Sequence, residues 1–150
     1  MNQNKRQVPR RAMALDLGEK RIGVALSDAS LSLARSFSVI KRSSRLADFK
    51  KIRQIIDEQG IDLVIVGLPT LSDGQEGPKA AWARSYAGDL DNHINAQVRL
   101  WDESYSTIDA EKSLRDRGVS RKKRKKKIDA VAAAFILQSY LDALQESPVE

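Results

Sequence analysis

The stretch that most limits the possible folds is a run of six apolar or small residues, LVIVGL, at positions 63–68. A strand with one face in water alternates apolar and polar residues, whereas a strand of a parallel sheet is covered on both faces and is apolar throughout. Parallel neighbours also need long crossover connections, which are usually helices. The run therefore predicts a central strand in a sheet with helices on both faces.

The segments around this run predict the other elements. Residues 12–18 and 21–28 are apolar runs separated by Glu19 and Lys20, which predicts a β-hairpin. The remaining elements are predicted in the order strand 36–42, helix 46–59, strand 63–68, loop 69–78, helix 80–94, strand 96–101, helix 106–117 and helix 128–144. A meander followed by alternating helices and strands predicts an α/β fold with a mixed five-stranded sheet and helices on both faces.

Length and composition favour one domain. A chain of 150 residues with 41% apolar residues can build one hydrophobic core. We expect a single domain over residues 12–145, a flexible basic N-terminal tail at 1–11 and a frayed C-terminus at 146–150. The sequence contains no cysteine, which excludes disulfides, zinc-thiolate sites and thiol nucleophiles. A polar start and the lack of a long apolar run predict a cytoplasmic protein with no membrane partner.

The positive charge is concentrated in one segment. Seven consecutive cations occupy positions 121–127: Arg121, Lys122, Lys123, Arg124, Lys125, Lys126 and Lys127. Without these seven, 19 basic residues remain against 20 acidic ones, so the rest of the chain is nearly neutral. A basic loop on a neutral body predicts contact with a polyanion such as nucleic acid at one place. A solvated charge run with no ligand is the alternative.

Asp16 is a carboxylate inside an apolar strand, in the run AMALDLG at positions 12–18. Burying an ionised carboxylate costs several kcal/mol unless a partner compensates its charge. Asp16 either ends its strand and bonds the turn that follows, or it binds a metal or a substrate.

Two other acids are placed where they could meet Asp16. The carboxyl ends of parallel strands share one edge of a sheet, and Asp16 and Glu103 both lie near such ends. Asp129 is predicted in the first turn of the last helix, on the side that also carries Ala132 and Ile136 and that we expect to be buried. A surface position for Glu103 and a helix-dipole role for Asp129 are the alternatives.

Three carboxylates that converge would repel one another without a cation, so convergence predicts a metal. Oxygen ligands without His or Cys favour Mg²⁺ or Mn²⁺ over zinc. Two such ions about 3.5–4 Å apart stabilise the attacking water and the leaving oxygen of a phosphodiester. The basic run ends two residues before Asp129, so its cations would lie beside the metal site.

The same residues resemble a known family. The segments ALDLGEKRIGVALSD (14–28), VGLPTLSDGQEG (66–77), DESYST (102–107) and KIDAVAAAFILQSYL (127–141) are similar to those of the YqgF-type (RuvX-like) pre-16S rRNA nucleases, also described as Holliday junction resolvases. This resemblance implies an RNase H-like fold and places Asp16, Glu103 and Asp129 on the acidic positions of the family. Ser104 stands where the family usually has Arg, so Arg99, Lys112 or the basic run would have to supply that cation.

Three more residues are candidate contacts for nucleic acid. Tyr105 follows Glu103 closely and could stack on an unpaired base. Gly74 and Gly77 precede a helix, so their amides could hold a phosphate, although a simple connection explains them equally well. We expect Trp82, Tyr86 and Trp101 to be packing residues.

The leading functional hypothesis is a Mg²⁺-dependent or Mn²⁺-dependent endonuclease acting on structured RNA, with pre-16S rRNA 5′-end processing as its task. A resolvase of branched DNA uses the same chemistry and would favour a homodimer over a monomer. A non-catalytic RNA-binding module of ribosome assembly would need the basic run but not the acids. An ATP-binding domain also carries an Asp-x-Gly hairpin, but it needs a second domain for which 150 residues leave no room.

Overall fold

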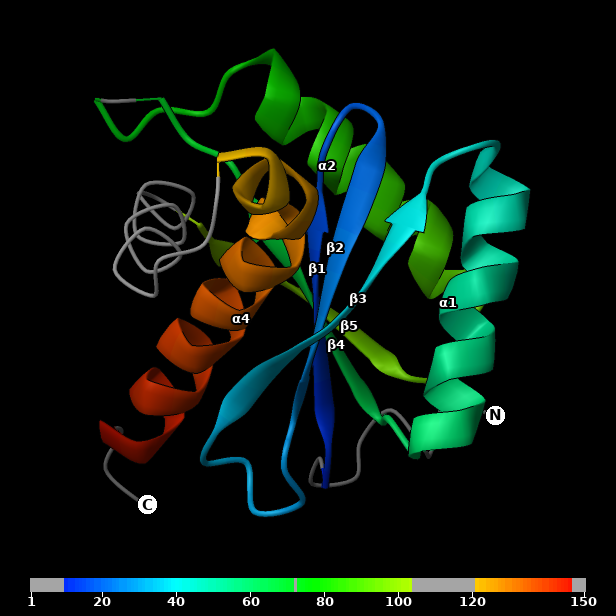
Figure 1. Ribbon diagram of the computed structural model, residues 1–150, viewed down its shortest axis with the longest axis vertical. Helices are drawn as coiled ribbons and strands as arrows, with labels where there is room; N and C mark the ends of the chain where they lie inside the picture. The colour runs from blue at the N-terminus through cyan, green and yellow to red at the C-terminus, as the bar shows by residue number, and fades with distance from the viewer. Residues whose placement is uncertain (1–9, 72, 104–120, 147–150) are drawn as a thin grey trace.

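The computed structural model describes residues 10–71, 73–103 and 121–146, and for 121–128 the backbone only (Figure 1). Its five strands form one sheet in the order β3-β2-β1-β4-β5. The strands are β1 (Ala12–Leu17), β2 (Arg21–Ser27), β3 (Ala34–Lys41), β4 (Leu63–Leu68) and β5 (Gln97–Asp102). The helices are α1 (Arg45–Gln59), α2 (Pro78–Asp91) and α4 (Arg121–Glu146).

The sheet is mixed, as the sequence predicts. β1 pairs with β2, and β2 with β3, in antiparallel register. β4 runs parallel to β1 on one side and to β5 on the other. The carboxyl ends of β1, β4 and β5 therefore lie together at one edge of the sheet.

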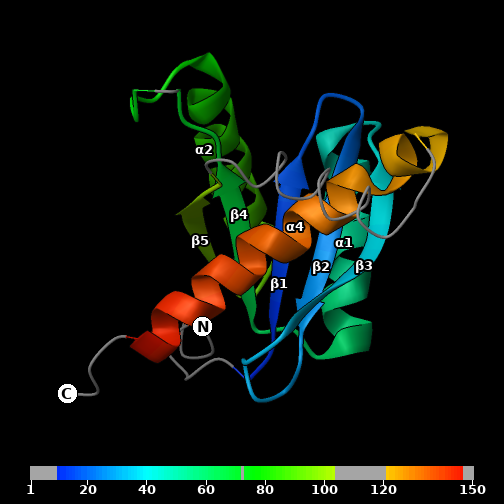
Figure 2. The ribbon, with the colours of Figure 1, turned by 60° about the vertical axis from the view of Figure 1, so that its left-hand side comes forward.

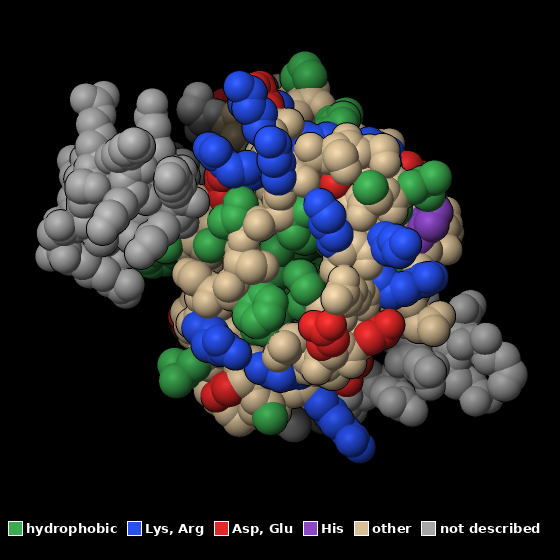
Figure 3. Space-filling view, turned by 45° about the vertical axis from the view of Figure 1, so that its right-hand side comes forward, with side chains coloured by type: hydrophobic (Ala, Val, Ile, Leu, Met, Phe, Trp, Pro, Cys, Tyr) green, Lys and Arg blue, Asp and Glu red, His purple; other side chains and the backbone are tan. Residues whose placement is uncertain are grey.

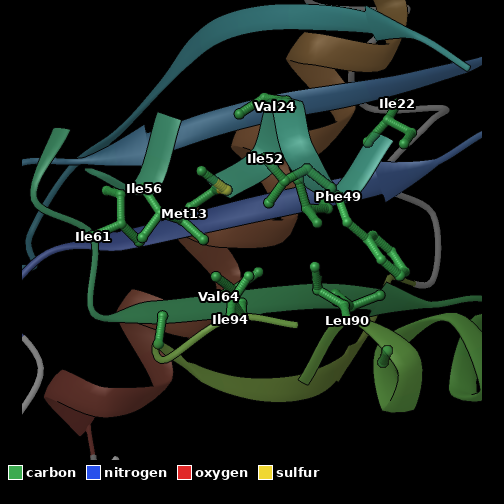
Figure 4. Close-up of a cluster of buried hydrophobic side chains, with 14 of the residues drawn as sticks. Met13, Ile22, Val24, Phe49, Ile52, Ile56, Ile61, Val64, Leu90 and Ile94 are labelled. Atoms are coloured by element: carbon green, nitrogen blue, oxygen red, sulfur yellow. The ribbon is translucent and has the colours of Figure 1, made fainter. Parts of the chain in front are cut away.

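Helices cover both faces of the sheet, which explains the uninterrupted apolar run of β4. α4 crosses one face, and α1 and α2 lie on the other (Figure 2). Val64 and Val66 belong to the core that includes the α1 and α2 side chains, whereas Leu63 and Ile65 pack with those of α4. Figure 4 shows the first of these cores between the strands and α1. All residues of β4 are buried, so a polar residue would be costly at any of them.

Local signals set the limits of α1 and α2. The Ser44 hydroxyl accepts a hydrogen bond from the Ala47 amide at the start of α1, and Gly60 ends that helix in a left-handed conformation with φ 64°. α2 begins at Pro78, two residues earlier than predicted, because proline suits the first helical position.

The last helix differs most from the prediction. We expected residues 121–127 to form a loop and the helix to begin at 128, but α4 begins at Arg121. The predicted helix start was wrong because Lys and Arg are good helix formers, and the basic run contains no Gly or Pro that would keep the helix from extending N-terminally past Ile128. Asp129 therefore lies in the third turn of α4 instead of its first. The predicted helix at 106–117 lies outside the described residues.

The described surface carries charges of both signs. Figure 3 shows Lys and Arg side chains spread over one face, with some Asp or Glu side chains next to each other in its lower part and others scattered among the cations. This mixture agrees with the near-neutral balance of the chain outside the basic run. In the described part of the chain, no helix has the length and apolar character needed to cross a membrane.

Candidate metal and nucleic-acid site

Asp16 lies near the carboxyl end of β1, on the face that α4 covers. Alternate residues of β1 face opposite sides, and Ala12 and Ala14 belong to the α4 core while Met13 and Leu15 belong to the other. Asp16 therefore points toward α4, and its residue is only 9% exposed. A buried acid at this position needs a compensating group.

A glycine beside Asp16 lets α4 approach the sheet. Asp16 is paired with Gly23 of β2, so the two residues share a face. A β-carbon added at Gly23 would overlap the backbone carbonyl of Asp129. The missing side chain thus allows the α4 backbone to rest directly on β2, which brings Asp129 beside Asp16.

A second glycine lets Glu103 reach Asp16. β4 lies between β1 and β5, and Glu103 directly follows β5. A β-carbon added at Gly67 of β4 would overlap the Glu103 carboxylate, and its next neighbour would be the side chain of Ile136. The Glu103 side chain therefore crosses β4 over Gly67. Neither glycine was among the predicted site residues, because their role depends on strand order and register.

The Asp16 and Glu103 carboxyl groups form a buried acid pair. Burial and the neighbouring Glu103 raise the pKa of Asp16 to about 8, and burial raises the pKa of Glu103 as well. The two groups are close enough for a hydrogen bond, which requires a proton on one of them. Glu103 Oε2 is buried and receives no hydrogen bond from the described residues. The pair therefore holds either a shared proton or a cation.

Asp129 has a different partner. Its Oδ2 accepts a hydrogen bond from Arg21 Nε at 3.2 Å, and both side chains are partly exposed. Its charge nevertheless contributes to the raised pKa of Asp16. Among the described residues, no three Asp, Glu or His side chains stand in an arrangement ready to hold a metal ion. Asp16 and Glu103 are together, and Asp129 is turned toward Arg21.

All three predicted acids nevertheless line one pocket of about 560 Å³. Its wall also includes Arg42, Lys79 and Trp82, which the sequence analysis did not assign to the site. In the sequence, Arg42 follows Lys41 and Lys79 stands alone, with no motif around either, and Trp82 carries the helical spacing of a packing residue. Only the tertiary fold brings them to the acids.

The other residues predicted to contact nucleic acid either do not line this pocket or lie outside the described residues. Gly74 lies in a turn with φ 82°, Gly77 is the N-cap of α2, and neither lines the pocket. Arg99, one candidate substitute for the missing family cation, donates a hydrogen bond from Nη1 to the Tyr140 hydroxyl at 2.8 Å. Ser104, Tyr105, Lys112 and the side chains of the basic run lie outside the described residues.

The mixed sheet, its strand order and the acids at the strand ends define an RNase H-like protein. The fold is similar to that of Thermus thermophilus RuvC bound to a Holliday junction substrate, with a TM-score of 0.58 and 17% identity over 91% of this chain and 96% of that one. It is also similar to the fowlpox virus resolvase in complex with Holliday junction DNA, with a TM-score of 0.56 and 13% identity over 91% and 99% of the two chains.

Sequence comparison identifies the family within this class. The chain belongs to the RuvX family, described as Holliday junction resolvase, whose sequence model matches residues 10–143. A relative from Thermoanaerobacter pseudethanolicus, named "Putative pre-16S rRNA nuclease", is 42% identical over 134 residues, which is 89% of this chain and 96% of that protein. A relative of the same name from Myxococcus xanthus is 43% identical over 89% of this chain and 88% of that protein.

Proposed function

We propose that this protein is a divalent-metal-dependent endonuclease that hydrolyses phosphodiester bonds in structured RNA, at the 5′ end of pre-16S rRNA. The observation that carries the proposal is the buried acid pair, in which the Glu103 carboxyl group lies next to that of Asp16 and Glu103 Oε2 has no donor among the described residues. A cation between the two carboxylates would compensate both charges at once. Membership of the RuvX family and the names of the relatives support the activity.

The donor set fits Mg²⁺ or Mn²⁺. All candidate ligands are carboxylate oxygens, and these hard donors suit such ions better than zinc. Asp16 and Glu103 would hold the first ion, and Asp129 would join them or bind a second one after leaving Arg21. When bound, the metal would activate water and stabilise charge on the cleaved phosphodiester.

Cations of the chain itself would bind and position the substrate phosphates. Arg21, once released from Asp129, would be a cation next to a pocket-lining acid and could bind a phosphate. Lys79 also lines the pocket, and its charge acts on Glu103. The basic run at the start of α4 would contact more distant phosphates, which positions the backbone without reading its sequence.

The test compares the wild-type chain with Asp16→Asn on a precursor 16S rRNA fragment and on a synthetic four-way DNA junction, in Mg²⁺, in Mn²⁺ and in EDTA. We expect metal-dependent cleavage of the RNA by the wild type and a loss of more than about 100-fold in the variant, because charge stabilisation worth several kcal/mol is removed. Asp57→Asn, an exposed acid on α1, is the matched control and should keep full activity. Equal activity of wild type and Asp16→Asn would refute the proposed site.

The second candidate is cleavage of branched DNA, which the description of the matching family favours. A resolvase cuts two strands symmetrically, so it should act as a homodimer with two pockets. Cleavage of the junction with the RNA left intact would decide for this function. A monomer that cleaves only the RNA would decide against it.

A further inference from the structure

An arginine stacked on a tryptophan also forms part of the pocket wall. Arg42, which directly follows β3, has its guanidinium carbon 4.5 Å from the ring centroid of Trp82 on α2. Both residues line the same pocket as Asp16 and Glu103. A guanidinium plane next to an indole is a surface on which a flat aromatic group can stack.

Hydrogen bonds hold the Arg42 side chain in place. Its Nη1 donates to the carbonyl of Gly18 at 2.7 Å and to that of Glu19 at 3.0 Å, in the turn between β1 and β2. Its backbone amide donates to the Lys20 carbonyl at 2.9 Å. The guanidinium is thus fixed by the same hairpin that carries Asp16.

The charge of Arg42 is not neutralised by a carboxylate among the described residues, and its Nε is buried there without an acceptor. Arg45 provides the contrast. Its guanidinium also lies over the Trp82 ring, at 5.7 Å, but it forms an ion pair with Asp89 on α2. The charge of Arg45 is therefore balanced by Asp89, whereas the charge of Arg42 at the pocket has no carboxylate partner among the described residues.

We propose that the Arg42–Trp82 wall binds one unpaired nucleobase of the substrate, next to the phosphodiester that the acids attack. This inference rests on the proposed nuclease function. The pocket volume of about 560 Å³ is within the range of ligand sites. The pocket lining combines the acids with aromatic and apolar residues, which include Trp82, Leu17, Pro69 and Pro78. A nucleotide matches this lining, with its phosphate toward a metal at the acids and its base on the Arg42–Trp82 wall.

Stacking is tolerant of base identity, since every base has a π-face. A base inside a continuous duplex is already stacked on its neighbours, so it can stack on Arg42 and Trp82 only after it leaves the helix. The protein should therefore cleave beside a single-stranded, bulged or frayed nucleotide and act poorly within a regular duplex. Base identity at that position should matter little.

The first experiment measures cleavage of an RNA that contains a single-stranded segment at the cleavage site, with an abasic nucleotide placed at each position in turn. One position should lower kcat/KM about 5- to 150-fold, which corresponds to about 1–3 kcal/mol per stacked base. Trp82→Leu should cause a similar loss on the unmodified RNA and little further loss on the abasic one. Trp101→Phe, whose ring packs on Tyr140 outside the pocket, is the matched control.

Arg42 is tested by replacing its planar group while keeping its charge. Arg42→Lys should lower kcat/KM on the unmodified RNA and lose most of the abasic effect. Arg53 donates a hydrogen bond to the His93 carbonyl and does not line the pocket of Asp16 and Glu103, so Arg53→Lys should behave as wild type. An abasic effect of full size in the Arg42→Lys protein would exclude Arg42 from the stack.

A binding experiment separates this inference from the nuclease proposal and leaves Trp82 unaltered. In a Trp101→Phe protein that also carries Asp16→Asn, Trp82 is the sole tryptophan of the chain, and no cleavage should interfere. An eight-nucleotide single-stranded RNA should quench its fluorescence, and the same sequence in a blunt duplex should not. Absence of quenching by the single strand would overturn the inference. Quenching in a protein whose wild-type form cleaves neither RNA nor DNA would keep the base site and refute the nuclease.

Discussion

Replacement of Asp16 by Asn should stabilise the metal-free protein, and by an amount that depends on pH. Asn has nearly the shape of a protonated Asp but no charge. Burial and the neighbouring Glu103 raise the pKa of Asp16 from its usual 3.8 to about 8. The folded protein therefore keeps a proton that the unfolded chain has lost. The wild-type stability is fully present below about pH 4 and decreases as the pH rises from about 4 to about 8.

The size of the effect follows from this shift. One pKa unit corresponds to about 1.4 kcal/mol, and about three units separate pH 7 from the usual pKa, which gives about 4 kcal/mol. Glu103 can carry the shared proton in place of Asp16, which lowers the expected difference to about 2–4 kcal/mol. Each kcal/mol changes Tm by about 2–4 °C in a chain of this size. At pH 7 the variant should melt about 4–16 °C above the wild type, and at pH 4 the two should agree.

The assay is thermal unfolding followed by circular dichroism in EDTA, at intervals from pH 4 to pH 8. Asp28→Asn is a control of opposite sign. Hydrogen bonds from the Ser32 amide, the Ser30 hydroxyl and the Leu33 amide lower the pKa of Asp28, so its charged form stabilises the fold and Asn should be less stable at neutral pH. An Asp16→Asn protein that is less stable than wild type at pH 7, or whose difference does not change with pH, would refute the buried acid pair.

Three further predictions concern the glycines, the Asp129 ion pair and the basic run. Gly23→Ala should lower the unfolding free energy by about 1–3 kcal/mol because the added carbon overlaps α4, whereas Gly88→Ala, with open space around it in α2, should raise it by up to about 1 kcal/mol; urea denaturation measures both. Arg21→Gln should tighten Mg²⁺ binding without nucleic acid because Asp129 loses a competing cation, and calorimetry showing weaker or unchanged binding would contradict this. Serine at positions 122–126 should weaken binding to all nucleic acids and reduce its salt slope, by up to about 0.9 per lost phosphate contact on duplex DNA; an unchanged slope would mean that these residues bind no phosphate.

The sheet was predictable because its signals are local. The apolar run of β4 indicates burial on both faces, and the hairpin around Glu19 and Lys20 requires only the neighbouring residues. The buried side of α4 was also predicted correctly, since Ala132 and Ile136 are buried as their spacing indicates. The predicted start of α4 was wrong because a run of like charges is typical of a solvated loop, whereas Lys and Arg also have high helix propensity and here extend the helix to Arg121.

The site was only partly predictable because its construction depends on tertiary register. The acids are visible in the sequence as polar residues at strand ends. The roles of Gly23 and Gly67 depend on which backbone or side chain passes over each of them, and this follows from strand order. Trp82 was expected to be a packing residue, and it does pack against the core, but its ring also lines the pocket.

The long helix α4 connects Asp129 at the site to core residues far from it. At about 1.5 Å per residue, the eleven steps from Asp129 to Tyr140 cover about 16 Å of one helix, and Ile136 and Leu141 are buried in this part of α4. A tilt of about 5° about Tyr140 would displace Asp129 by about 1.4 Å, and misplacement of about 1 Å can cost about 100-fold in rate. Core substitutions far from any carboxylate can therefore displace Asp129 and lower the reaction rate, although no site residue has been replaced.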